Sequence, residues 1–239
     1  MKLGNYAHVS LSVHTLRESL PFYAALGFSR LFGNDDPQPW VLLSDGVLNV
    51  HLYESSFPSP ALHYFSSSMN AKVAELGQQA LKLQEQISKD GTRRQHTLVD
   101  PNDMHVVLMH HDDADMPRPE GSSRSVLGTF AEISISTNNL AGSAAFWKSI
   151  GFTERHASAN PYPWTIMSDD ILTVGLHQTS TFNAPALTYL TMSVSQQIAQ
   201  LKSIGVALTH EIKGRSGELA GAILNAPDGQ LFFLLQGKP

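Results

Sequence analysis

The sequence predicts an α+β protein built from two copies of one half. Three observations predict this class: an internal repeat that covers most of the chain, strand-like and helix-like patterns in the same order in each copy, and a polar segment between the copies. The strand and helix patterns come in segregated groups. We therefore expect an α+β fold and not a parallel α/β sheet.

The repeat is visible when the chain is compared with itself at a shift of 124 residues. Residues 22–28 (FYAALGF) then lie over 146–152 (FWKSIGF), and residues 37–40 (PQPW) lie over 161–164 (PYPW). Later segments match at shifts of 125 and 126 residues, as small loop insertions require. We interpret the two copies as the products of a duplication.

The repeat predicts two domains, at 1–112 and 127–239. The segment between them, 113–126, is acidic and then rich in Pro, Gly and Ser, without an apolar period. Such a composition is typical of a linker. Each domain is predicted to contain two units of a strand, a helix and further strands, which makes four units in the chain.

The elements of the first copy follow from its apolar periods. Alternation over 8–13 predicts a half-buried strand, and helical spacing over 16–26 predicts a helix that ends at Gly27. The second unit is expected to start near Ala61. Further strands are expected at 40–43, 48–53, 95–99 and 105–110, and a second helix at 71–87.

Composition excludes several functional classes. The net charge of −5 and the pI near 6.1 give no electrostatic footprint for nucleic acid. The chain lacks an apolar run of 18 residues, so no membrane span is expected. It contains no cysteine, which excludes disulfides and thiolate metal sites. The first residues enter a strand pattern without a signal peptide, and we expect a cytoplasmic protein.

Four short motifs carry a resemblance to a known family: HVSLSV at 8–13, FYAALGF at 22–28, DPNDMHVVLM at 100–109 and APDGQLFFLL at 226–235. In this order and spacing they resemble the glyoxalase/bleomycin-resistance/dioxygenase, or vicinal-oxygen-chelate, superfamily. The resemblance covers nearly the whole chain except the linker. It implies tandem glyoxalase-like domains, made of four βαβββ modules whose curled mixed sheets surround a polar cleft.

The resemblance also implies where metal ligands belong, on the first and last strands of the modules. In the first copy these positions are His8, His51, His63 and Val107. In the second copy they are Glu132, Gly175, Thr188 and Phe233. Metal-binding members usually carry Glu at a last-strand position, so His51 and Val107 depart from the family pattern. The implied metal site is His8, His51 and His63, with Zn, Ni, Fe or Mn as the divalent ion.

Strand alternation provides a separate test of these residues. Val9 and Leu11 lie on the apolar face of their strand, so His8 lies on the polar face. His51 and Tyr53 share the polar face of a later strand. If the polar faces line one cavity, these imidazoles converge and suit a transition metal. The alternative for each histidine is a polar residue on a solvated sheet face.

Other residues are candidates for substrate contact. Trp40 and Trp164 follow Pro at the same place in both copies, where each can stack on a planar ligand or pack in the core. Tyr53 is a candidate hydrogen-bond donor to a ligand, and His105 is a candidate cleft residue. Glu132, at the start of the second copy, is a candidate base or ligand, or else a remnant of the duplication.

Three functions fit these observations. A glyoxalase-type lyase or isomerase and a ring-cleaving dioxygenase both act on a small molecule with adjacent oxygens through a divalent metal. A metal-free small-molecule binding protein of the bleomycin-resistance type is the alternative. We favour a metal-dependent enzyme, because drift rarely leaves imidazoles at three of four ligand positions. A tandem chain is compatible with a monomer or a homodimer.

Overall fold

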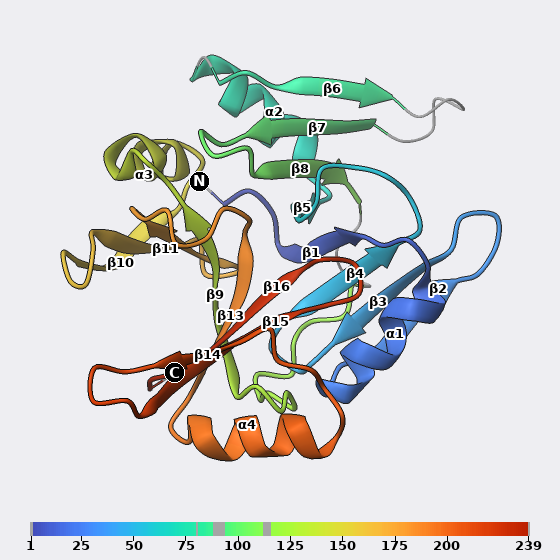
Figure 1. Ribbon diagram of the computed structural model, residues 1–239. Helices are drawn as coiled ribbons and strands as arrows, with labels where there is room; N and C mark the ends of the chain where they lie inside the picture. The colour runs from blue at the N-terminus through green and yellow to red at the C-terminus, as the bar shows by residue number, and fades with distance from the viewer. Residues whose placement is uncertain (1, 80, 88–93, 112–115, 239) are drawn as a thin grey trace. The chain divides into compact units, whose positions relative to one another are not determined.

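The computed structural model describes every residue except 1, 80, 88–93, 112–115 and 239. Its elements repeat one order four times, namely a strand, a helix and three strands (Figure 1). This order confirms the α+β class and the four βαβββ modules. None of the described helices is both long enough and apolar enough to cross a membrane.

The first half holds modules 1 and 2. Module 1 contains β1 (Tyr6–Ser12), α1 (Leu16–Ala25), β2 (Ser29–Asn34), β3 (Trp40–Ser44) and β4 (Asn49–Tyr53). Module 2 contains β5 (Ala61–Ser66), α2 (Met69–Gln78), β6 (Gln84–Ile87), β7 (Arg94–Val99) and β8 (His105–His110).

The second half holds modules 3 and 4 in the same order. Module 3 contains β9 (Thr129–Ser136), α3 (Leu140–Ser149), β10 (Thr153–Ser158), β11 (Trp164–Ser168) and β12 (Thr173–His177). Module 4 contains β13 (Ala186–Thr191), α4 (Val194–Ser203), β14 (His210–Lys213), β15 (Leu219–Asn225) and β16 (Leu231–Gln236).

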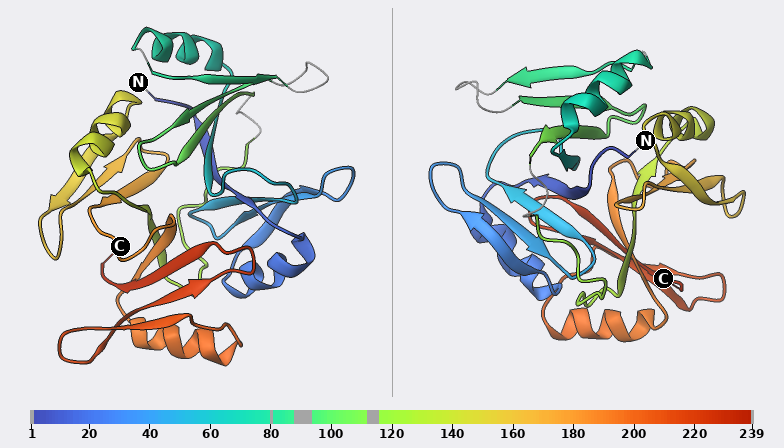
Figure 2. Two further views of the ribbon diagram at one scale, coloured as in Figure 1. Left: turned by 45° about the horizontal axis from the view of Figure 1, so that its top comes forward. Right: turned by 180° about the vertical axis from the view of Figure 1, so that it is seen from behind.

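The strands form two mixed sheets of eight strands, one from β1–β8 and one from β9–β16. In each half the first strands of the two modules pair antiparallel, β1 with β5 and β9 with β13. The first strand of the later module then pairs parallel with its last strand, β5 with β8 and β13 with β16. Helices pack on their own modules, such as α2 on β8 and α4 on β15 (Figure 2).

One predicted helix is too long. We expected a helix over 71–87, whereas α2 ends at Gln78 and Gln84–Ile87 is the strand β6. Leu83 and Ile87 continue the helical spacing of the preceding residues, but β6 forms an antiparallel ladder with β7 in which Ile87 faces Arg94. Pairing with the neighbouring strand therefore overrides the local helical period.

The first helix follows its sequence signals. The hydroxyl of Thr15 accepts a hydrogen bond from the Glu18 amide at 3.3 Å, which caps the start of α1. After α1, Gly27 adopts a φ of +97°, and a Cβ there would lie 2.3 Å from the carbonyl oxygen of Arg124. Both the left-handed backbone and this close approach favour glycine, as the predicted helix end required.

Contacts group the chain into two compact units, and each unit contains residues from both halves. Unit 1 consists of Met1–Ser10, Pro58–Arg118 and Ile135–Asn183. Unit 2 consists of Leu11–Phe57, Pro119–Ser134 and Ala184–Pro239. Unit 1 therefore combines most of modules 2 and 3, and unit 2 combines most of modules 1 and 4.

Buried tyrosine–aspartate hydrogen bonds join the two modules of unit 2. The Tyr23 hydroxyl of α1 donates to Asp228 Oδ2 at 3.0 Å, and the Tyr189 hydroxyl of β13 donates to Asp45 Oδ2 at 2.7 Å. Both tyrosines are fully buried. Burial beside a carboxylate raises the pKa of each hydroxyl well above its ordinary value, so both remain donors.

Unit 1 contains the matching contacts. Trp147 lies at the place of Tyr23 in the repeat, and its Nε1 donates to Asp100 Oδ2 at 3.2 Å. Tyr64 lies beside Asp169, and burial together with this carboxylate raises the pKa of the Tyr64 hydroxyl. In both units, therefore, a buried aromatic side chain of one module lies beside an aspartate of the other module.

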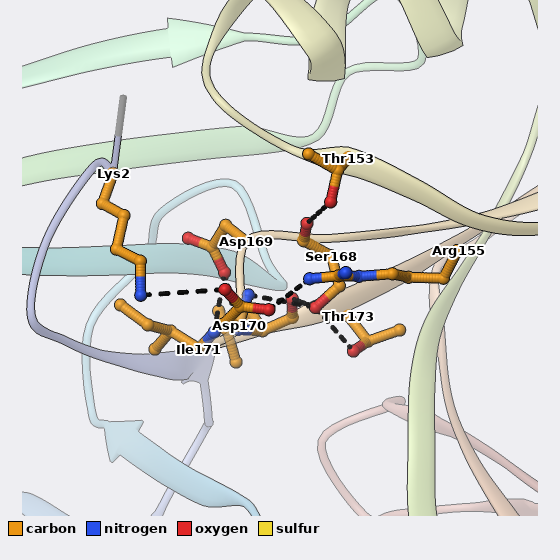
Figure 3. Close-up of polar contacts among 9 residues, drawn as sticks. Lys2, Thr153, Arg155, Ser168, Asp169, Asp170, Ile171 and Thr173 are labelled. Atoms are coloured by element: carbon orange, nitrogen blue, oxygen red, sulfur yellow. Dashed lines mark hydrogen bonds and ion pairs between the residues drawn. The ribbon is translucent and has the colours of Figure 1, made fainter.

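Asp169 also shapes the turn between β11 and β12. Its Oδ1 accepts hydrogen bonds from the amides of Ile171 and Leu172 at 3.0 and 2.8 Å. Beside it, Asp170 forms ion pairs with Lys2 and Arg155 on the surface of unit 1 (Figure 3). Such exposed pairs contribute little to stability, so the buried Asp169 is the structural residue of this turn.

The later part of the predicted linker is hydrogen-bonded within unit 2. The Arg124 amide donates to the Asp45 carbonyl at 2.6 Å, and the Val126 amide donates to the Leu26 carbonyl at 3.0 Å. Residues 119–126 are therefore held on unit 2 by backbone hydrogen bonds. Residues 113–115, at the start of the predicted linker, lie outside the described residues.

Candidate functional site

His8 and His63 face each other across the first strands of modules 1 and 2. They are partners in the antiparallel register of β1 and β5, and their ring centroids lie 5.5 Å apart. Directly opposite residues of an antiparallel pair project to the same face of the sheet. The structure therefore brings together two of the three predicted metal ligands, within unit 1.

His8 lies in an enclosed, aromatic environment, whereas His63 is partly exposed. His8 is 3% exposed, and the rings of Phe65 and Tyr6 lie 5.1 and 5.7 Å from its ring. Burial lowers the pKa of His63 to about 4, so this ring is neutral at pH 7. The neutral form of imidazole is the one that binds metal ions.

Ser10 contacts His63 directly. The Ser10 Oγ forms a short hydrogen bond with Nδ1 of His63, and the serine is fully buried. Either group can be the donor, depending on the tautomer of His63. Sequence reasoning placed Ser10 on the polar face of its strand but did not identify this contact, because it joins residues 53 positions apart.

The third position of this row holds Val107. His63 and Val107 are partners in the parallel register of β5 and β8, so the row reads His8, His63, Val107. Val107 is buried and provides no metal donor. Across the described part of the chain, no three His, Asp or Glu side chains are grouped to hold a metal ion.

The metal donors of this row are two imidazoles, without a carboxylate. The imidazoles of His8 and His63 suit a metal ion that takes two ligands from the protein. The row does not fit a site of two histidines and one carboxylate, because Val107 lies where the carboxylate belongs. His105, the partner of Ala61, lies two residues before Val107 on the same face and is partly exposed.

His51 lies in unit 2, in an aromatic cluster on β3 and β4. Its ring centroid lies 3.9 Å from that of Tyr53 and 4.8 Å from that of Trp40. Trp40 and Tyr53 are themselves register partners. The structure thus groups this predicted metal ligand with two predicted ligand-binding residues. Phe57, 6.0 Å from Tyr53, extends the cluster from a loop that the strand pattern did not cover.

The row of the second half has the same geometry and different chemistry. Glu132 pairs with Thr188, and Thr188 pairs with Phe233. Ser134 Oγ donates to Glu132 Oε1 at 2.5 Å and lies 2.6 Å from Thr188 Oγ1. Because Ser134 has one hydroxyl hydrogen, Thr188 is the donor in the second contact. Glu132 is thus a buried carboxylate that accepts a hydrogen bond from Ser134, which in turn accepts one from Thr188.

Trp164 belongs to a second aromatic cluster, in unit 1. Its ring centroid lies 5.1 Å from that of His156 and 6.3 Å from that of His177, its register partner. Tyr162 and Phe182 lie within about 6 Å of His177. His177 occupies the place of Tyr53 in the repeat, at a shift of 124 residues. The repeat could therefore have identified His177 as a candidate beside Trp164.

Comparison with known proteins identifies the fold. Neither a protein-family profile nor a curated protein sequence matches the chain. Solved structures do match it over its whole length. Catechol 2,3-dioxygenase has a TM-score of 0.64 at 13% identity, over 100% of this chain and 94% of that one. The 2,3-dioxygenase LapB from Pseudomonas sp. KL28 has a TM-score of 0.67 at 13% identity, with the same coverage.

A third structure agrees. The 2,2',3-trihydroxybiphenyl 1,2-dioxygenase from Sphingomonas wittichii strain RW1 has a TM-score of 0.60 at 14% identity, over 99% of this chain and 90% of that one. At these identities the likeness establishes the fold and leaves the chemistry to the residues of the site. The chain therefore has the same tandem fold as these dioxygenases, in agreement with the fold that the resemblance of its motifs predicted.

Proposed function

We propose that the first half binds a divalent metal ion through His8 and His63, and that the protein is an enzyme acting on a small molecule with two adjacent oxygens. The observation that carries this proposal is the His8–His63 pair, with ring centroids 5.5 Å apart. Two imidazoles can bind one ion through bonds of about 2.1 Å only if their rings are neighbours. The proximity of the two rings supports the proposal.

The chain's own residues set the character of the site. A bound divalent ion would supply Lewis acidity toward two adjacent oxygens. His8 and His63 provide two imidazole ligands, and Val107 leaves the third position without a charge. Phe65 and Tyr6 shield His8 from water. A ligand that offers two oxygens suits such a site, since the protein leaves several coordination positions open.

The structural neighbours support the substrate class. Two of the three proteins named above are described by the catechol or trihydroxybiphenyl on which they act, both of which carry adjacent hydroxyl groups. A homoprotocatechuate 2,3-dioxygenase variant from B. fuscum, with a TM-score of 0.65 at 12% identity, was solved in complex with HPCA. We therefore propose an aromatic ring with adjacent oxygens as the substrate, and a ring-cleaving or a glyoxalase-type lyase reaction as the chemistry.

Glu132 and Tyr53 are proposed as acid–base residues, and Trp40 and Trp164 as stacking residues. Glu132 suits proton transfer because its buried carboxylate accepts a hydroxyl hydrogen from Ser134. Trp40 and Trp164 suit planar ligands because each belongs to an aromatic cluster and is partly exposed. His51, which lies in unit 2 beside Trp40 and Tyr53, is proposed as a wall of the Trp40 cluster.

A second function, metal-free binding of a small molecule, is favoured by one observation. Val107 and Phe233 are apolar at the position where the family carries its carboxylate ligand, in both halves. In that case the imidazoles of His8 and His63 contact the ligand directly.

Titration calorimetry tests the choice. Mn²⁺ or Ni²⁺ is titrated into the chelator-treated protein, with and without catechol, for the native chain and for His8→Ala, His63→Ala and His105→Ala. We expect one binding event in the native chain that catechol strengthens. Both row variants should lose it, whereas His105→Ala should keep it, because His105 lies outside the row. Catechol binding that needs no metal would establish the metal-free function instead.

A further inference from the structure

We propose that Ser10 is a positioning residue that fixes the tautomer and the ring orientation of His63, so that Nε2 carries the lone pair offered to a ligand. The proposal deepens the proposed function, because it concerns the nitrogen through which His63 would bind the metal ion. It also makes a statement about the metal-free protein that can be tested without metal.

The strand geometry places the serine beside the ring. Ser10 lies two residues after His8, so both side chains project from the same face of β1. Its register partner is Ala61, two residues before His63, which places Ser10 diagonal to His63 across the strand pair. Ser10 is fully buried, and its Oγ forms a hydrogen bond with Nδ1 of His63. Water therefore does not compete for this hydroxyl.

The hydrogen bond leaves two arrangements of protons. A neutral imidazole carries hydrogen on one nitrogen and a lone pair on the other. If Nδ1–H donates to Ser10 Oγ, Nε2 holds the lone pair and can bind a metal. If Ser10 donates to Nδ1, Nε2 carries the hydrogen and cannot. Metal-binding histidines usually donate their other N–H to a fixed acceptor, and Ser10 is that acceptor for His63.

The second half repeats this use of serine. Ser134 lies at the place of Ser10 in the repeat, at a shift of 124 residues. Its Oγ contacts both polar residues of its row, Glu132 and Thr188. In each half, therefore, a buried serine two residues after the first row residue holds the polar side chains of that row. This repetition indicates a positioning role that the sequence retains while the row itself changes.

Nitrogen-15 NMR at pH 7.5 tests the tautomer in the metal-free protein. Long-range proton–nitrogen spectra distinguish the two neutral forms, and a His63→Asn variant assigns the signals. We expect the Nδ1–H form of His63 in the native chain and a mixture of both forms in Ser10→Ala. The matched control is Ser134→Ala, an equally buried serine in the other half, which should leave the His63 signals unchanged.

Metal affinity provides the second readout. Mn²⁺ or Ni²⁺ should bind Ser10→Ala about 10- to 100-fold more weakly than the native chain, and Ser134→Ala with unchanged affinity. An Nε2–H tautomer in the native chain, or no change of tautomer in Ser10→Ala, overturns the proposal. If the native chain shows the expected tautomer but binds no metal, the metal-dependent function fails while the role of Ser10 stands.

Discussion

The rows at the first strands of the two halves have one geometry and two chemistries. In the first half the row is His8, His63 and Val107, and in the second it is Glu132, Thr188 and Phe233. Both rows are built from an antiparallel and a parallel strand pair. One offers two imidazoles, whereas the other offers a buried carboxylate with hydroxyl donors.

This difference shows which features the fold determines. The strand register fixes which three residues lie side by side, and it is the same in both halves although the residues differ. The identities of those residues then decide between metal binding, proton transfer and simple packing. Each row lacks what the other has: the first has no carboxylate, and the second has no imidazole.

The largest expected effect concerns pH and the imidazole row. The pKa of His63 is about 4 in the folded chain and near 6.5 when the ring is solvated. Between these values the unfolded chain binds a proton that the folded chain does not, so stability falls as the pH is lowered from 6.5 to 4. The full effect is on the order of 3 kcal/mol.

Urea denaturation of the chelator-treated protein across this pH range measures the effect. A His63→Asn variant is the control, and it should show a flatter dependence. Equal slopes for the native chain and this variant would show that His63 titrates normally in the folded protein.

Completing the first row is the second prediction. Val107→Glu would place a carboxylate beside His63 and should raise Mn²⁺ affinity at least tenfold, equivalent to about 1.4 kcal/mol. Without metal the variant should be less stable, because an unpaired carboxylate replaces a buried apolar side chain. Calorimetry and thermal melts with and without Mn²⁺ measure both effects.

The matched variant in the second half is Phe233→Glu. It introduces the same carboxylate in a row without imidazoles and should gain no comparable affinity. A gain of similar size in both variants would mean that the added charge, and not the row, attracts the ion.

The third prediction compares the contacts that join modules. Tyr189→Phe removes a fully buried hydroxyl that donates to Asp45 at 2.7 Å. It should cost about 1.5 to 3 kcal/mol, because the carboxylate keeps its burial and loses a donor. Tyr23→Phe, which removes the donor to Asp228 at 3.0 Å, should cost a similar amount. Denaturant unfolding measures both, and a loss below about 0.5 kcal/mol would assign these contacts no stabilising role.

The smallest expected effect on metal affinity is that of a change in the second row. Glu132→Gln removes the charge of the carboxylate but keeps its shape, and it should leave metal affinity in the first half within about twofold of the native value. A loss of metal in this variant would mean that Glu132 contributes to the metal site.

Local patterns were enough to predict most of the fold. Alternation predicted β1 and the two closing strands β7 and β8, and Gly27 predicted the end of α1. The repeat predicted the four modules. Two strands were exceptions. The strand β2 was not predicted. The strand β6 was taken as part of a helix, because Leu83 and Ile87 fit a helical period as well as a strand, and only the ladder with β7 decides between them.

The site was less accessible to sequence reasoning. The resemblance identified His8 and His63, and the structure places them together. The contact between Ser10 and His63 depends on the register of two strands far apart in the chain, which no local pattern contains. The same holds for the pairing of Tyr189 with Asp45, which joins the two halves of the sequence.

The metal content of the protein tests the central claim most directly. Mass spectrometry on protein purified without an affinity tag, before and after chelator dialysis, is compared for the native chain and the His8→Ala/His63→Ala double variant. We predict about one equivalent of Zn, Ni, Fe or Mn in the native chain and none in the folded double variant. Equal metal in both proteins, or no uptake by the native chain after soaking, would contradict the claim.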